Sequence, residues 1–146
     1  GCWEQYSSGS ALVREARNAA VQDAARAARL LEAAGGEVTK IKGPLVTQLA
    51  KEGDELSIEL LRELGTWIGT GCAGLASVLD PEIFIVGGGV VEAGELILEP
   101  ARAAYEASLP ALNVRPVAPI VAAHMRNDAG IVGAAALARE AGPAGG

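Results

Sequence analysis

Three consecutive glycines, Gly87, Gly88 and Gly89, have the clearest chemical meaning in this sequence. They follow Ile83–Val86, an apolar and mostly β-branched run that is typical of a short strand buried on both faces. Glycine lets a ligand approach the backbone closely, and open α/β sheets bind ligands at the carboxyl ends of their strands. The N–H groups of such a turn suit an anion such as a nucleotide phosphate. A tight turn without a ligand is the other interpretation, since the spacing fits neither a Walker loop nor a dinucleotide fingerprint.

The remaining candidates for chemistry are few. His124 is the one histidine of the chain, and a lone histidine beside a strand end is more often structural than catalytic. Cys2 and Cys72 indicate no disulfide framework, and with one distant histidine they form no metal-ligand cluster. The turn Asn127–Gly130 could serve the same anion site as the glycines, although we favour a helix cap formed by Asp128.

Periodic patterns predict the elements that must position these residues. The first helix should begin at Ser10 as its N-cap and bury a stripe made mostly of alanine. Pro100 should begin a second helical piece after a bend, and the tail 142–146 should fray. We expect helices at Ser10–Ala34, Pro44–Glu52, Glu55–Leu79, Glu92–Ser108 and Ala129–Ala141, and strands at Ile83–Val86 and Val117–Ala122.

The longest predicted helix, 55–79, is capped by Asp54 and carries an apolar face at three- and four-residue spacing. Glycine inside a helix costs about 1 kcal/mol of propensity, so we expect another backbone to pack closely against its glycines. Cys72 should be an inert buried thiol, and Trp67 a packing or interface residue. The apolar face is Leu61, Leu64, Ile68, Cys72, Leu75 and Leu79, and the glycines are Gly65, Gly69, Gly71 and Gly74.

The composition is that of an acidic chain of one-domain size. Half of the 146 residues are hydrophobic, but only five are aromatic (two Trp, two Tyr and one Phe), which fits Ala-rich helices on a small sheet. A net charge of −6 argues against binding to nucleic acid. The uncharged segment 64–79 is shorter than the roughly 20 residues that span a membrane. Two distant cysteines without a recognisable signal peptide indicate a reducing cytoplasm.

Two predicted strands are too few for a finished domain, because helices need a broader sheet to cover. The chain begins at Gly1 without a methionine and reads as a part of something longer. We therefore expect the missing strands to lie before Gly1.

Three motifs, in order and at matching separation, resemble those of ROK-family sugar kinases, most closely glucokinases of the actinobacterial type. They are G-C-W-E-Q-Y-S-S-G at 1–9, D-P-E-I-F-I-V-G-G-G-V at 80–90 and N-D-A-G-I-V-G-A-A at 127–135. The resemblance covers essentially all of the chain. It implies an α/β fold, the C-terminal lobe of an actin-like ATPase (ribonuclease H-like), with an incomplete sheet and with the N-terminal half of the family absent.

Several residue roles follow from this resemblance. Glu4 matches a glutamate that contacts sugar hydroxyls. The glycine turn, Gly87 to Gly89, matches the turn that lies against the bound nucleotide. Cys2 matches the last of the cysteines that, with a histidine, hold a structural Zn²⁺. Because zinc takes four ligands, this chain alone should not hold it. The implied cofactors of the parent protein are ATP and Mg²⁺.

By the same resemblance, the parent protein should phosphorylate glucose or a related hexose. We also expect it to be cytoplasmic and a homo-oligomer. The family's catalytic aspartate has no counterpart in this chain, so the chain alone should be inactive. The sugar-binding lobe of a ROK-type transcriptional regulator is one alternative. An oligomerisation module built on the glycine-rich helix and Trp67 is another. A different hexose, such as N-acetylmannosamine or fructose, and polyphosphate as the phosphoryl donor also stay open.

Overall fold

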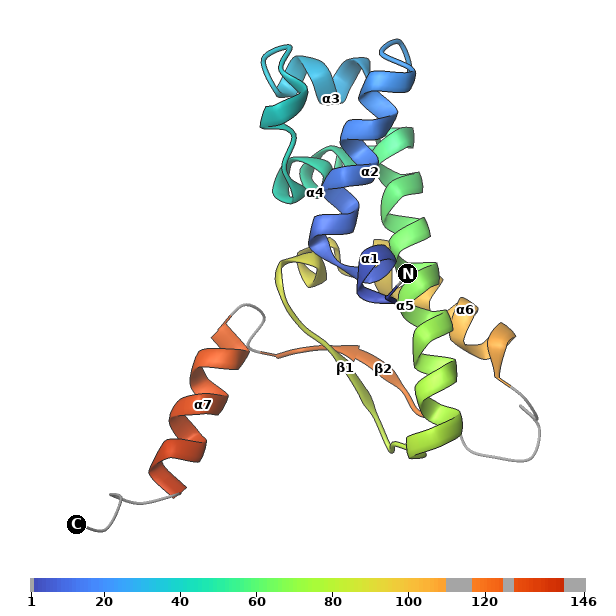
Figure 1. Ribbon diagram of the computed structural model, residues 1–146, viewed down its shortest axis with the longest axis vertical. Coiled ribbons are helices and arrows are strands. Elements are labelled where there is room, and N and C mark those ends of the chain that lie inside the picture. The colour runs from blue at the N-terminus through green and yellow to red at the C-terminus, as the bar shows by residue number, and fades with distance from the viewer. Residues whose placement is uncertain (1, 110–116, 125–127, 141–146) are drawn as a thin grey trace.

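The computed structural model describes residues 2–109, 117–124 and 128–140, which form a helical body with a small sheet at one end and a separate last helix (Figure 1). The predicted fraying tail, 142–146, and Asn127 of the predicted turn lie outside the described residues. In chain order the elements are α1 (Glu4–Ser7), α2 (Gly9–Gln22), α3 (Ala28–Ala33), the 3₁₀ turn η1 (Val38–Lys40), α4 (Gly43–Lys51), α5 (Glu55–Leu79), β1 (Phe84–Val86), the 3₁₀ turn η2 (Gly89–Ala93), α6 (Glu95–Ser108), β2 (Ile120–Ala122) and α7 (Ala129–Glu140).

The central helix is α5, against which α1, α2, α4 and α6 pack (Figure 1). Its bounds are those predicted, and the Asp54 carboxylate accepts a hydrogen bond from Ser57 N at 2.9 Å, which confirms the predicted cap. The first four residues of the predicted apolar face are buried. The last two, Leu75 and Leu79, are 39% and 67% exposed, because the side of the helix that is buried there carries Ala73 and Ala76 instead.

Two glycines of α5 let the backbone of α6 approach closely, which confirms that part of the expectation. A Cβ atom at Gly69 would lie 2.8 Å from Tyr105 N and 2.9 Å from the carbonyl carbon of Ala101. A Cβ at Gly65 would lie 3.3 Å from Ala101 N. The lost helix propensity at these two positions is therefore offset by close packing of two helices.

The other two glycines of α5 do not meet a backbone, and for them the expectation is wrong. A Cβ at Gly71 would overlap the indole ring of Trp3, a side chain. A Cβ at Gly74 would have no atom within 4 Å. The four glycines differ only in the face of α5 on which they lie. The sequence does not show which faces of the helix are covered by other parts of the chain.

The first predicted helix, 10–34, is wrong as a single element, because α2 and α3 are separate helices. The break falls at Asp23, whose backbone leaves the helical region with φ −141° and ψ 84°. The Asp23 carboxylate accepts a hydrogen bond from Arg26 N at 3.0 Å. Aspartate competes in this way with the helical hydrogen bonds of its own backbone. The alanines around it bury little area, so their packing does little to keep the helix continuous.

Pro44 begins α4 as predicted, whereas the predicted effect of Pro100 is wrong. Pro100 lies inside α6, which continues from Glu95 to Ser108. A proline removes one backbone hydrogen bond, and the close packing against α5 holds the helix through this position. The bend instead precedes α6, at Gly94, where φ is 59°.

The sheet has two parallel strands among the described residues, with Ile85 of β1 opposite Val121 of β2. β1 is shorter than predicted and is not buried on both faces. Phe84 and Val86 are half-buried, and the ring of Phe84 meets that of Tyr105 on α6 at 5.6 Å between centroids. Ile85, on the opposite face, is 64% exposed, since no helix of the described chain covers that face.

The last helix, α7, matches its predicted start at Ala129 and lies apart from the helical body (Figure 1). Its side chains Ile131 and Leu137 are 74% and 68% exposed. No helix among the described residues is long and apolar enough to span a membrane.

Candidate functional site

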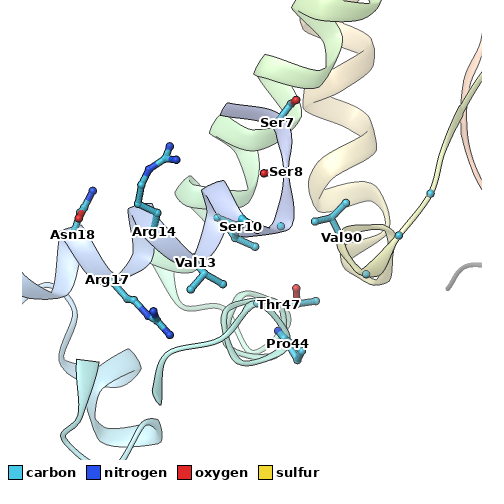
Figure 2. A pocket seen from close by; sticks show the side chains of 16 residues that line it. Ser7, Ser8, Ser10, Val13, Arg14, Arg17, Asn18, Pro44, Thr47 and Val90 are labelled. Atoms are coloured by element: carbon cyan, nitrogen blue, oxygen red, sulfur yellow. The ribbon is translucent and has the colours of Figure 1, made fainter. Parts of the chain in front are cut away.

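A cavity of about 950 Å³ lies beside the glycine turn, and all three of the predicted glycines line it. One wall is the end of α1 and the start of α2, from Ser7 to Val13, and another is the start of α4, with Pro44 and Thr47 (Figure 2). The chain leaving β1, through Gly87–Gly89 to Val90, closes the third side. Segments that are far apart in the sequence thus meet at the end of β1, as expected for a ligand site in this class of sheet.

The glycine turn has a backbone shape that excludes other residues at one position. Gly88 adopts φ 81° and ψ −178°, a region occupied essentially by glycine alone. A hydrogen bond of 2.8 Å from Ala123 N to Val86 O ties the end of β1 to the residue after β2. The sheet therefore fixes the place from which the turn departs, and the glycines leave its backbone accessible from the cavity.

The start of α2 brings the positive end of a 14-residue helix to the cavity. The predicted N-cap at Ser10 is wrong. Ser8 takes that position, with an extended backbone, and its hydroxyl accepts a hydrogen bond from Ala11 N at 3.2 Å. Ser10 lies inside the first turn, and both serines line the cavity (Figure 2). Unpaired N–H groups of a helix start favour an anion.

The charge of the lining is opposite to that of the whole chain. Arg14 and Arg17 line the cavity, and the described lining residues include no aspartate or glutamate, although the chain carries a net charge of −6. The Arg17 guanidinium donates hydrogen bonds to the carbonyl oxygens of Thr39, at 2.6 Å, and Ile41, at 3.0 and 3.2 Å. These bonds hold the segment before α4 against α2 and keep a cation beside the cavity.

Apolar side chains complete the lining. Leu12 and Val13 come from α2, Pro44 from α4, and Val90 from the residue after the glycine turn. A cavity with arginines, a helix start and an apolar wall suits a ligand that is anionic at one end and apolar at the other. A nucleotide has both features, whereas an inorganic anion has only the first.

Glu4, the predicted sugar ligand, does not line this cavity. It is exposed on α1, the short helix whose last residue, Ser7, lines the cavity together with the next residue, Ser8. The indole N–H of Trp3 donates a hydrogen bond of 2.7 Å to the carbonyl oxygen of Trp67. This bond docks α1 on α5 and fixes the place from which Glu4 projects.

The remaining candidates fall outside the cavity. Cys2 is exposed, and the described residues contain no group of three or more His, Cys, Asp or Glu side chains that could hold a metal ion. His124 is exposed in the turn after β2. Cys72 is buried as predicted, and burial raises the pKa of its thiol to about 11, which favours the protonated, less reactive form.

Sequence reasoning missed two parts of the cavity. The run Ser7–Ser10, small and polar ahead of a helix, was a usable signal for a helix start at a ligand site. Thr47 gave no signal, because it occupies an ordinary position in a short amphipathic helix. Its place in the cavity depends on how α4 packs beside α2.

Comparisons with known proteins agree with the motifs of the sequence. The model of the ROK family matches residues 1–141. The glucokinase of Streptomyces coelicolor is 47% identical over 143 residues, which cover 98% of this chain and 45% of that protein. The glucokinase of Thermotoga maritima is 27% identical over 140 residues, covering 96% and 43%.

Solved structures give the same result. A ROK family glucokinase from Streptomyces griseus, in complex with glucose and AMPPNP, superposes with a TM-score of 0.89 at 46% identity, covering 96% of this chain and 45% of that one. A ROK hexokinase from Thermus thermophilus has a TM-score of 0.63 at 25% identity, covering 97% and 41%. The chain thus spans less than half the length of these relatives, and it has part of the actin-like ATPase fold that was expected. It belongs to the ROK family.

Proposed function

We propose that this chain is part of a glucokinase that transfers a phosphoryl group from ATP to glucose, and that the cavity beside Gly87–Gly89 binds the nucleotide. The observation that carries the proposal is the lining of that cavity: a glycine turn, the start of α2, two arginines, an apolar wall and no carboxylate among the described lining residues. The 47% identity to a Streptomyces glucokinase supports it. The remaining machinery would come from the rest of a longer protein.

The residues of this chain would bind and orient the two reactants. N–H groups of the glycine turn and of the start of α2 would stabilise the negative charge of the phosphates. The carboxylate of Glu4 would accept hydrogen bonds from adjacent sugar hydroxyls. Phosphoryl transfer also requires a base that takes the proton of the attacking hydroxyl. The described residues that line the cavity include no aspartate, glutamate or histidine, so we expect the chain alone to bind ligands without turnover.

The metal ions implied by the family do not fit the described residues alone. Magnesium is held by carboxylate and phosphate oxygens, and no described carboxylate lines the cavity. Zinc takes four ligands in a tetrahedron, and no group of three candidate ligands exists among the described residues. We therefore propose Cys2 only as one ligand of a zinc site that the rest of a longer protein completes.

A reconstitution assay tests the proposed function. The chain is assayed for glucose phosphorylation, with ATP and Mg²⁺, by itself and together with the separately expressed remainder of a ROK glucokinase. We expect activity only in the mixture, and a loss of it with Glu4→Gln, which keeps the size of the side chain but removes its charge. Turnover by the chain alone would contradict our placement of the catalytic base outside it.

A subunit interface is a second candidate role, supported by an exposed aromatic cluster. Trp3, Tyr6 and Trp67 are 41%, 41% and 38% exposed, and the Tyr6 and Trp67 rings lie 4.7 Å apart. Tyrosine and tryptophan are enriched in protein interfaces. We propose that the parent enzyme is a cytoplasmic homo-oligomer in which this cluster is buried. Sedimentation at several concentrations, with and without Trp67→Ser, tests this role.

A further inference from the structure

Arg17 pairs with backbone carbonyls rather than with a carboxylate. Its guanidinium donates hydrogen bonds to the carbonyl oxygens of Thr39, at 2.6 Å, and of Ile41, at 3.0 and 3.2 Å. Within the described residues it forms no ion pair, whereas four other arginines each pair with a carboxylate: Arg14, Arg26, Arg29 and Arg102. The planar fork of an arginine that engages two acceptors fixes their position. Arg17 therefore ties α2 to the backbone that precedes α4.

The segment that Arg17 holds, residues 37–42, has few other attachments. Most of its residues are exposed, and Ile41 is the one that is fully buried. In the part of the chain that the structure describes, no other hydrogen bond joins α2 to residues 37–47. The position of this segment relative to α2 thus depends on Arg17 and on the burial of Ile41.

This segment leads directly into α4, whose start forms one wall of the large cavity, with Pro44 and Thr47. A Cβ at Gly43 would lie 4.0 Å from Val13 Cγ2, which belongs to the α2 wall, so the two walls meet where α4 begins. Pro44 and Thr47 also line a second cavity, of about 430 Å³. Packing therefore supports this end of α4 only in part, and the tie from α2 supplies the rest.

Figure 2 shows that Arg17 extends from α2 on the side of α4, whereas Arg14 extends on the opposite side. Arg14 donates a hydrogen bond of 2.6 Å to the carbonyl oxygen of Gln5 and pairs with Glu15 at 2.8 Å. Both arginines line the cavity, but only Arg17 connects the α2 wall with the chain that leads into the α4 wall.

We propose that Arg17 is a positioning residue of the cavity: its bonds to Thr39 and Ile41 hold the start of α4 at the distance from α2 at which one ligand contacts both walls. This inference rests on the proposed function, because it concerns how the proposed site is assembled. If the held arrangement becomes only partly populated, the apparent affinity falls by the same fraction. Lysine keeps the positive charge but lacks the rigid fork, so Arg17→Lys separates positioning from charge.

Calorimetry and hydrogen exchange on the 146-residue chain test the inference. ADP is titrated into the unaltered chain, into Arg17→Lys and into the control Arg29→Lys, which alters an exposed ion pair with Glu52 outside the cavity lining. Arg17→Lys should weaken ADP about tenfold, as expected if the held arrangement falls to about one tenth of the molecules. Amide exchange in 37–47 should become faster while exchange in α5 stays the same, and Arg29→Lys should change neither quantity.

Three results would overturn the inference while the proposed function stands. The first is an Arg17→Lys chain that binds ADP as tightly as the unaltered chain. The second is weaker binding without faster exchange in 37–47, which would make Arg17 a direct contact of the ligand. The third is faster exchange in α5 as well, which would make Arg17 a residue of general stability. If the unaltered chain binds no ADP, the proposed nucleotide site and the inference fall together.

Discussion

Replacing Gly69 with alanine should destabilise the chain even though alanine is the better helix former. A Cβ at Gly69 would overlap the carbonyl oxygen of Ala101. It would also lie 2.8 Å from Tyr105 N and 2.9 Å from the carbonyl carbon of Ala101, and all three are backbone atoms of α6. No side-chain rotation can relieve this overlap, so α6 must move away from α5 as a unit. Gly74→Ala is the matched control, because a Cβ there meets no atom within 4 Å.

The expected magnitudes follow from two opposing effects. Overpacking costs about 1–3 kcal/mol, and the upper end applies here because the obstacle is backbone. Better helix propensity returns about 1 kcal/mol, so Gly69→Ala should lose about 2 kcal/mol. At Gly74 only the second effect operates, and the variant should gain up to about 1 kcal/mol. For a chain of this size 1 kcal/mol corresponds to roughly 2–4 °C in Tm.

Urea and thermal unfolding, followed by circular dichroism at 222 nm, would measure both variants. The predicted result is a Tm about 4–8 °C below that of the unaltered chain for Gly69→Ala and slightly above it for Gly74→Ala. A Gly69→Ala chain as stable as the unaltered one would refute the close approach of α5 and α6. A loss at Gly74 equal to that at Gly69 would show that overlap of the added Cβ with α6 is not what distinguishes the two sites.

Three further predictions concern the site and its supports. Gly71→Ala should displace the Trp3 indole, which would lower stability by about 1–3 kcal/mol and change the tryptophan emission; an unchanged spectrum would contradict it. Since burial raises the pKa of Cys72 to about 11, iodoacetamide at pH 8 should label exposed Cys2 only, and both thiols in urea; mass spectrometry reads the difference. Gly88→Ala, at φ 81°, should cost about 1–3 kcal/mol and weaken ADP, measured by calorimetry, whereas equal binding would remove the turn from the site.

The sequence predicted best what local chemistry decides. The bounds of α5 followed from its cap at Asp54 and its apolar spacing, and the start of α4 followed from Pro44. The glycine turn was predicted as a ligand site because open α/β sheets bind ligands at the carboxyl ends of their strands, and the family resemblance favoured this over a turn without a ligand. These features depend on residues near one another in the chain, so they can be predicted from the sequence without knowledge of the fold.

The errors arose where a single side chain or a distant segment decides the outcome. Asp23 splits the first helix because its own side chain competes for a backbone N–H, a choice that the alanine pattern hides. Ile85 is exposed because the sheet has only two strands in the described chain, although its run of apolar residues reads as buried on both faces. Thr47 lines the cavity because α4 packs beside α2, a contact that the sequence does not show.

A crystal structure of the chain with AMPPNP tests the central claim most directly. The account predicts density for the nucleotide in the cavity of about 950 Å³, against Gly87–Gly89 and the start of α2. Nucleotide bound elsewhere on the chain, with this cavity empty, would contradict it.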